Sequence, residues 1–367
     1  MLRTLAASCS RSVVELNLDM MASASAAVVG GAGYLTSTAH PGAPEGAVKQ
    51  ARSAPGASIA AASMAHQRVD ARFVLPFAVE GALVLGGLEA WIRGLAEVGV
   101  DVSTAPGASR AADLVVAPVE HADEAIAAGA PAVLLEGGGG SSALRRAGYG
   151  VRTLLPIPSI DQARHLVRPD HRQAAVYAVE HWSVATTAKR RARNALAKAL
   201  LSRGRLPGAV PAIAVGVRRE APPFLLSAAA EHGVPSDAGW FMTLGGFDVL
   251  SRSVFQLFAA GSSTPTWVVK FTRVPGHAEP FDRDERGLRL VQGAGGIVPA
   301  HVPRILGRFE AESLQASVET AAVGYRLTDF MLRAVPREEK VRVIEAVAGW
   351  ILELGRASCR ERVFRVV

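Results

Sequence analysis

A series of short apolar segments between residues 240 and 327 constrains the fold of this chain more than any other feature. Two segments that read as strands, WFMT and SVFQLF, flank a glycine-containing turn, and WVVKF follows as a third strand. Next come a helical segment, FDRDERGLRLVQ, and two further strands in PRILGRF and ASVETAAVGYRL. Short apolar runs bounded by turn residues are typical of strands. This order predicts an antiparallel sheet with one helix inserted after its third strand.

Two charged residues in the series have a spacing suited to binding a nucleotide. A nucleoside triphosphate carries about four negative charges, and a protein that transfers its phosphoryl group works by positioning and charge stabilisation. Lys270, on the third strand, would supply a positive charge to the phosphates. Glu285 comes fifteen residues later on the helix, and we expect it to reach back and hold the ammonium group. Taken singly, each residue also fits an ordinary solvated surface charge.

The turn between the first two strands is a candidate phosphate-binding loop. It contains Gly245 and Gly246, whose backbone N–H groups are free to approach an anion. Ser251 and Ser253 follow, and we expect their hydroxyls to lie over the phosphates. A lone glycine turn is weak support, but its place ahead of Lys270 and Glu285 strengthens the interpretation.

The segments WVVKF, DERGLRLV, PRILG and VETAAVGYRL resemble the aminoglycoside phosphotransferase and choline kinase family, which has a protein-kinase-like fold. The resemblance covers residues 223–354, about a third of the chain, and corresponds to the N-terminal lobe of that fold. It implies an ATP-dependent phosphotransferase that uses Mg²⁺ and phosphorylates a hydroxyl group of a small molecule. It also implies a link between two lobes whose backbone reads the adenine edge, and we assign Glu319 and Ala321 to it.

The family's catalytic loop, HGD-x-x-x-x-N, and its later metal-binding aspartate are not found in the sequence. We therefore predict no catalytic residue and no metal ligand in this chain, and we expect the Mg²⁺ ligands in a C-terminal lobe that it lacks. The segment GRASCRERV, which begins at Gly355, resembles the translation of a sequencing-adapter read-through. We expect residues 355–367 to be an artefactual tail.

The region before this lobe predicts a different fold. Residues 1–72 are rich in Ala, Ser, Gly and Pro and read as a disordered leader or a misplaced start. From residue 73 to 175, apolar runs alternate with amphipathic segments, which predicts a small Rossmann-like α/β domain with a parallel sheet. We expect its buried strands at Val84, Val100, 114–116 and 133–135. The predicted fold class is thus α/β followed by α+β.

Three glycines of this α/β region are candidate ligand contacts. Gly86 and Gly87 come after the first strand, and Gly137 comes after the last of the expected parallel strands. Loops at these ends of parallel strands commonly hold ligands. They support an alternative function, a transferase that takes a nucleotide-sugar or methyl donor. A non-catalytic nucleotide-binding module is a third possibility.

Between the two regions, residues 176–222 read as a basic helix and a proline-rich linker. The net charge of the chain is +7, and the stretch TAKRRARNALAKALLSRGR carries seven cations without an acidic residue. Residues 189–205 could contact an anionic membrane surface, although a solvated linker helix is the simpler interpretation. We expect no nucleic-acid partner, no transmembrane segment and a cytoplasmic location. The expected partners are a nucleotide and a hydroxylated small molecule.

Overall fold

The structure is a computed structural model that describes residues 68–105, 112–182, 187–204, 212–246, 250–293, 302–322, 327–332 and 335–364. Most of the predicted leader, the tip of the glycine turn at 247–249 and the end of the predicted link at Val323 and Gly324 lie outside these residues.

The described strands all belong to one mixed sheet. They are β1 (Gly81–Val84), β2 (Asp101–Ser103), β3 (Leu114–Pro118), β4 (Ala132–Glu136), β5 (Gly150–Ile157), β6 (His165–Val167), β7 (Ile213–Val217), β8 (Gly239–Thr243), β9 (Ser253–Phe258), β10 (Trp267–Phe271), β11 (Ile305–Ala311) and β12 (Leu314–Thr320). Their order across the sheet is β11-β12-β10-β9-β8-β6-β5-β7-β4-β3-β1-β2. Only the pairs β1–β2, β1–β3 and β3–β4 are parallel, so the fold is mixed α/β with a mostly antiparallel sheet.

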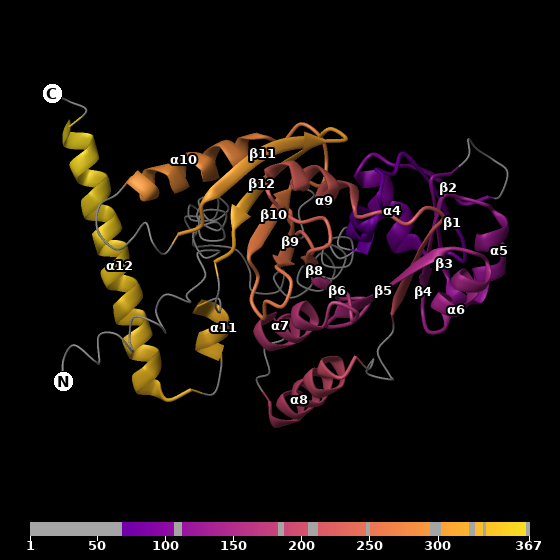
Figure 1. Ribbon diagram of the computed structural model, residues 1–367, viewed down its shortest axis with the longest axis horizontal. Helices are drawn as coiled ribbons and strands as arrows, with labels where there is room; N and C mark the ends of the chain where they lie inside the picture. The colour runs from indigo at the N-terminus through magenta and orange to yellow at the C-terminus, as the bar shows by residue number, and fades with distance from the viewer. Residues whose placement is uncertain are drawn as a thin grey trace, which may run out of the picture.

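The described helices lie around this sheet (Figure 1). They are a 3-10 helix at Val69–Val74, α4 (Glu89–Glu97), α5 (Ala122–Ala127), α6 (Gly140–Arg146), α7 (Arg172–Trp182), α8 (Ala188–Ser202), α9 (Phe224–Ala229), α10 (Glu279–Gly293), α11 (Leu327–Leu332) and α12 (Arg337–Phe364), with short 3-10 turns at Val119–His121 and Ala230–His232. None of the helices in the described residues is long and apolar enough to cross a membrane.

Strands β1 to β4 form the parallel end of the sheet, with helices on both faces. Alternate strand residues such as Val84 pack with Trp91 of α4, whereas their neighbours, such as Leu83, pack with α5 and α6. The predicted strands at Val84, 114–116 and 133–135 are confirmed, while Val100 is buried just before β2 begins. The sheet continues into antiparallel strands, so this part is one end of a larger sheet rather than a sheet with two free edges.

Strands β5, β6 and β7 join the parallel end to the antiparallel end. The first half of β5 pairs with β7 and its second half with β6, which in turn pairs with β8. The fully buried β7 lies in the segment that we predicted to be a proline-rich linker. Its short apolar run, IAVGV, lies among glycines and prolines that favour turns. The strand forms nonetheless because it is buried between β4 and β5.

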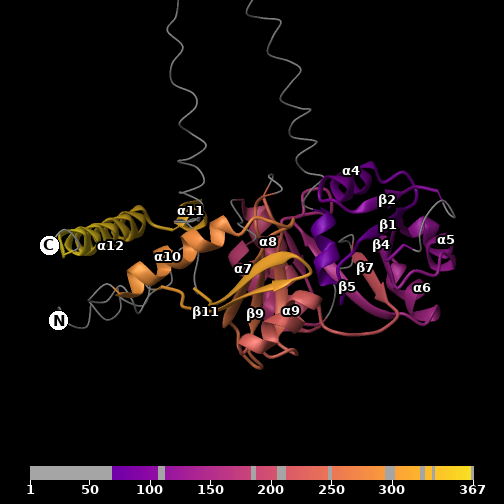
Figure 2. The ribbon, with the colours of Figure 1, turned by 90° about the horizontal axis from the view of Figure 1, so that it is seen from above.

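Strands β8 to β12 and helix α10 form the antiparallel end, in the chain order that the sequence predicts. One face of these strands is apolar and carries Trp240, Phe255 and Phe271, which pack into the same core as the parallel end. The opposite face is covered in part by α7, which packs on Phe241 and Phe258. Figures 1 and 2 both show α10 and α12 beyond the antiparallel end, away from β1 and β2.

The prediction that the leader is disordered is wrong at its C-terminal end. Residues 69 to 74 form a 3-10 helix in which every side chain is buried. Phe73 packs edge-on against Phe271 of β10, with ring centroids 4.8 Å apart. Apolar and charged residues are mixed in this segment without a helical or strand period. The start of the folded region was therefore predicted a few residues too late.

His171 connects the start of α7 to β8 and gives the fold a dependence on pH. Its Nδ1 accepts a hydrogen bond from the backbone N–H of Trp240 at 2.8 Å. Burial, assisted by the positive charge of Arg168, lowers the pKa of His171 from its ordinary 6.5 to about 4. The folded protein therefore favours the neutral imidazole, and the unfolded chain takes up a proton first as the pH falls.

We predict that the free energy of unfolding decreases as the pH falls from about 6.5 to about 4, and that His171→Asn flattens part of this decrease. Asparagine keeps an acceptor for the Trp240 N–H but does not titrate. Urea denaturation at several pH values measures the effect, with His277→Asn as a control at a histidine without a described hydrogen bond. Equal slopes for wild type and His171→Asn would contradict the prediction.

Candidate functional site

Lys270 lies on the face of the antiparallel end that is turned away from the aromatic core of Trp240, Phe255 and Phe271. In β10 it is opposite Val254 of β9 and Ser317 of β12, while its neighbours Val269 and Phe271 point into the apolar core. Because side chains alternate along a strand, Lys270, Ser317 and Glu319 share one face of the sheet. The strand pairing therefore places an ammonium group, a hydroxyl and a carboxylate together.

The ammonium group of Lys270 forms an ion pair with Glu319. Its Nζ lies 2.9 Å from Oε2 of Glu319, and the Ser317 hydroxyl donates to Oε1 at 3.2 Å. The side chain of Glu319 is only 2% exposed, whereas that of Lys270 is 17% exposed. A buried carboxylate is stable only when it is paired, so Glu319 fixes Lys270 in place. The Lys270 side chain is the more exposed of the pair.

The predicted pair between Lys270 and Glu285 is wrong. Glu285 lies on α10, where it bonds to Arg289 one turn later and to Arg308 of β11, whose Nη1 is 3.3 Å from Oε2. Hydrogen bonds from Arg308 to Asp282 and Glu285 raise the pKa of Arg308. The charges of α10 thus bind it to β11. Spacing along the chain placed a glutamate on the right helix but could not show which strand that helix contacts.

The glycine turn is held at its start by buried groups rather than left open. The N–H of Gly245 donates to Oγ of Ser253 at 2.8 Å and to Oδ2 of Asp70 at 3.1 Å. Ser253 is fully buried and donates its hydroxyl to Asp70 at 2.7 Å, so its predicted contact with phosphate is wrong. Gly246 is exposed, and the half-buried Ser251 lies beside it, so these two positions remain candidates.

The prediction that the backbone of Glu319 and Ala321 reads an adenine edge is also wrong. Glu319 lies within β12, paired with both β10 and β11, and contributes its side chain to the site. The N–H of Ala321 donates to the carbonyl of Thr266 at 2.9 Å, which continues the sheet. That N–H is therefore already bonded, and it cannot read an adenine edge without breaking the contact.

A buried network that the sequence did not predict supports the turn from the apolar side. Asp70 is completely buried and accepts a hydrogen bond from Nε of Arg273 at 2.8 Å. Arg273 also reaches the carbonyl of Gly246, at 3.3 Å, and Arg72 donates to the carbonyl of Arg273 at 2.7 Å. Burial lowers the pKa of Arg72 to about 10 despite the nearby Asp70 carboxylate. In the sequence, the only sign of this network was an Asp and an Arg two residues apart, Asp70 and Arg72, within an apolar segment.

Gly86 and Gly137 at the parallel end are explained by packing. Both have positive φ angles, and a Cβ atom at Gly86 would lie 2.6 Å from the ring of Pro118. A Cβ at Gly137 would lie 3.0 Å from Val119. Gly87 is exposed, with nothing within 4 Å of its Cβ position, so it alone of the three faces open space.

Glu136, at the carboxyl end of β4, is the buried acid of the parallel end. It accepts a hydrogen bond from Nε1 of Trp91 at 2.7 Å, and Arg68 lies 3.8 Å away. Burial raises the pKa of Glu136. In the described residues, no group of three or more His, Cys, Asp or Glu side chains could hold a metal ion.

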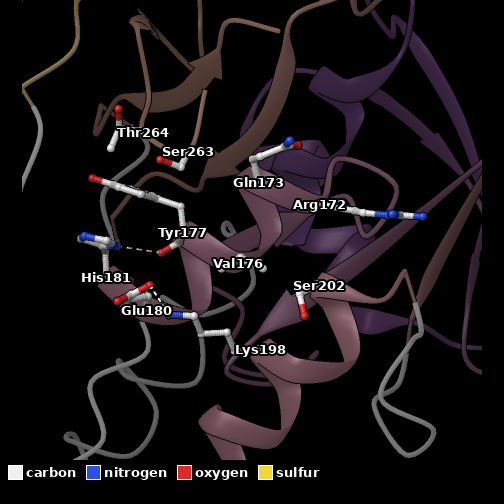
Figure 3. A pocket seen from close by; sticks show the side chains of 10 residues that line it. All are labelled: Arg172, Gln173, Val176, Tyr177, Glu180, His181, Lys198, Ser202, Ser263 and Thr264. Carbon is white, nitrogen blue, oxygen red and sulfur yellow. Dashed lines mark hydrogen bonds and ion pairs between the residues drawn. The ribbon is translucent and has the colours of Figure 1, made fainter. Parts of the chain in front are cut away.

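A cavity of about 590 Å³ lies between α7, α8 and the β9–β10 turn (Figure 3). Its walls include Tyr177 and His181, whose rings stack with centroids 3.8 Å apart, and the ion pair of Glu180 with Lys198. Ser263 and Thr264 line it from the turn. The residues that line this cavity do not include Lys270 or Glu319.

Comparison with solved structures finds three structures of WbdD, each with a low TM-score. No family model and no curated protein matches the chain. A crystal structure of WbdD has 11% identity, covering 80% of this chain and 69% of that one, with a TM-score of 0.20. WbdD with the kinase inhibitor LY294002 has 12% identity, covering 77% and 66%, with a TM-score of 0.19. A third, described as a bifunctional kinase-methyltransferase, has 12% identity, covering 75% and 64%, with a TM-score of 0.16. Superpositions this poor do not define a shared fold.

We predict that Asp70→Asn destabilises the protein by about 3–5 kcal/mol, because it leaves the buried Arg72 and Arg273 without a counter-charge. Urea or thermal unfolding measures the change. The exposed Asp237, replaced in the same way by Asn, should change stability by no more than about 0.5 kcal/mol. A loss below about 1 kcal/mol for Asp70→Asn would show that the network is not essential to the fold.

Proposed function

We propose that the antiparallel end binds the phosphates of ATP in a phosphotransferase that acts on a hydroxyl group of a small molecule. In that reaction the bond between the γ-phosphorus and the bridging oxygen of ATP breaks. A new bond forms from phosphorus to the acceptor oxygen, ADP leaves, and the hydroxyl proton passes to a base. The proposal assigns no base and no metal ligand to this chain.

The observation that carries the proposal is the ion pair of Lys270 with Glu319. A lysine that binds phosphate must present its charge from a fixed position, and the buried Glu319 carboxylate provides that position. The glycine turn joins β8 to β9, the strand beside β10, and within it Gly246 is exposed with Ser251 next to it. Mg²⁺ bound with the nucleotide would neutralise further phosphate charge.

The chain order supports the same conclusion. Three antiparallel strands with a lysine on the third, then a helix, then two strands is the order expected for the nucleotide-binding lobe of a kinase-like protein. In this chain the partner of the lysine comes from β12 rather than from helix α10. We propose that Glu319 takes the role of fixing the lysine.

We predict that Lys270→Ala weakens binding of MgATP by about 10- to 100-fold, because a charge-assisted contact with phosphate is lost. Isothermal titration calorimetry on the full chain measures the affinity. Lys198→Ala removes an exposed lysine that is paired with Glu180 and should leave the affinity unchanged. Unchanged affinity in Lys270→Ala would reject the proposal.

A double variant separates binding from stability. Lys270→Ala leaves the buried Glu319 unpaired and should lower the free energy of unfolding by about 3–5 kcal/mol. Adding Glu319→Gln removes the unpaired charge, and we expect most of the stability to return while MgATP binding stays weak. If binding returned together with stability, the loss in the single variant would be a folding defect.

An alternative function rests on the parallel end. Strands β2 and β3 lie on opposite sides of β1, so the chain changes direction across the sheet between them. The exposed Gly87 follows the carboxyl end of β1 at this point. A nucleotide-sugar or methyl donor would bind in such a crevice. Donor binding that Gly87→Val abolishes and Lys270→Ala leaves intact would favour it. Binding of MgATP without turnover on any acceptor would instead favour a nucleotide-binding module.

A further inference from the structure

Helix α8 has an exposed surface with a strong positive charge. Its four N-terminal cations, Lys189, Arg190, Arg191 and Arg193, are all exposed, and the helix contains no acidic residue. None of these four forms an ion pair with any residue that the structure describes. Thr187 caps the helix by accepting a hydrogen bond from the N–H of Arg190 at 3.2 Å. The charges therefore lie on a well-defined helix.

Among the described residues, one side of the helix packs against the rest of the molecule. Ala197 and Leu201 pack against α7, and the exposed Lys198 is neutralised by Glu180. The cavity shown in Figure 3 lies between α8 and the body of the protein. Figure 1 shows α8 on the far side of α7 from the sheet, so its other side faces outward.

The outward side of α8 combines two of these cations with an apolar side chain. Leu196 is 60% exposed and projects about 140° around the helix axis from the buried Leu201. At about 100° per residue, Lys189 and Arg193 project within about 60° of Leu196, whereas Arg190 and Arg191 project about 120° and 140° from it, on opposite sides of the helix. An exposed leucine bordered by unpaired cations is the pattern of a helix that lies on a charged interface.

We propose that the outward face of α8 binds the anionic phospholipid surface of a membrane. Lys and Arg side chains near such a surface are attracted to its negative headgroups, and Leu196 would enter the boundary between headgroups and acyl chains. The complementarity of charge selects an anionic partner. The helix has no aromatic residue on which a nucleic-acid base could stack, so its composition favours lipid over single-stranded nucleic acid.

Co-sedimentation of the full chain with vesicles tests the proposal. We expect binding to vesicles of mixed phosphatidylcholine and phosphatidylglycerol, little binding to pure phosphatidylcholine, and release at about 0.5 M salt, where screening is strong. The variant in which Lys189, Arg190, Arg191 and Arg193 are all replaced by Gln should lower the partition coefficient by roughly 100-fold. Leu196→Ser should lower it less, because it removes only the apolar contact.

A matched control replaces four exposed arginines elsewhere, Arg145, Arg146, Arg283 and Arg286, by Gln and lowers the net charge equally. We expect this control to bind anionic vesicles like wild type, and both variants to retain the wild-type thermal midpoint. Equal losses in the two variants would show that only net charge matters and would overturn the proposal. So would binding to an oligonucleotide, through the same four residues, without binding to vesicles.

Discussion

The buried carboxylate of Asp70 constrains this structure more than any other group. A charge without solvent must be compensated, and three elements provide the donors: Arg273 after β10, Ser253 at the start of β9, and the backbone of Gly245 after β8. The network therefore fixes the start of the glycine turn and the N-terminal 3-10 helix at the same time. The same 3-10 helix contributes Phe73 and Val74 to the apolar core that both ends of the sheet share.

The two faces of the antiparallel end have different roles. The Asp70 network and the aromatic side chains lie toward the apolar face, where they determine how the strands pack. The opposite face carries Lys270, Ser317 and Glu319, which form a second polar group with more exposure to solvent. A rigid apolar side allows the other side to hold a charge in a fixed place, which is what binding a phosphate requires.

The sequence predicted the elements well and their partners poorly. The order of strands and helix from β8 to β12 followed from short apolar runs and one amphipathic helix, because local patterns determine such elements. Strand β7 was missed because its five residues lie in a segment rich in turn formers, and only burial between β4 and β5 makes them a strand.

The candidate site shows the same limit. Lys270 and Glu319 were both identified, but the sequence assigned Glu319 to a backbone role and gave Lys270 the wrong carboxylate. Which acid meets a lysine depends on strand register and on the strand that α10 contacts, and neither is encoded in spacing along the chain. Asp70 was missed because its partner Arg273 lies about 200 residues away in the sequence.

Labelling with an ATP analogue that carries an acyl group on its γ-phosphate tests the proposed phosphate site most directly, because such a reagent acylates lysines beside the bound phosphates. The chain has only five lysines, at positions 49, 189, 198, 270 and 340, so mass spectrometry can assign every product. The account predicts that Lys270 is labelled and that excess ATP protects it, whereas any labelling of Lys189 is insensitive to ATP. Lys270 left unlabelled, or labelled equally with and without ATP, would contradict a nucleotide site at Lys270 and Glu319.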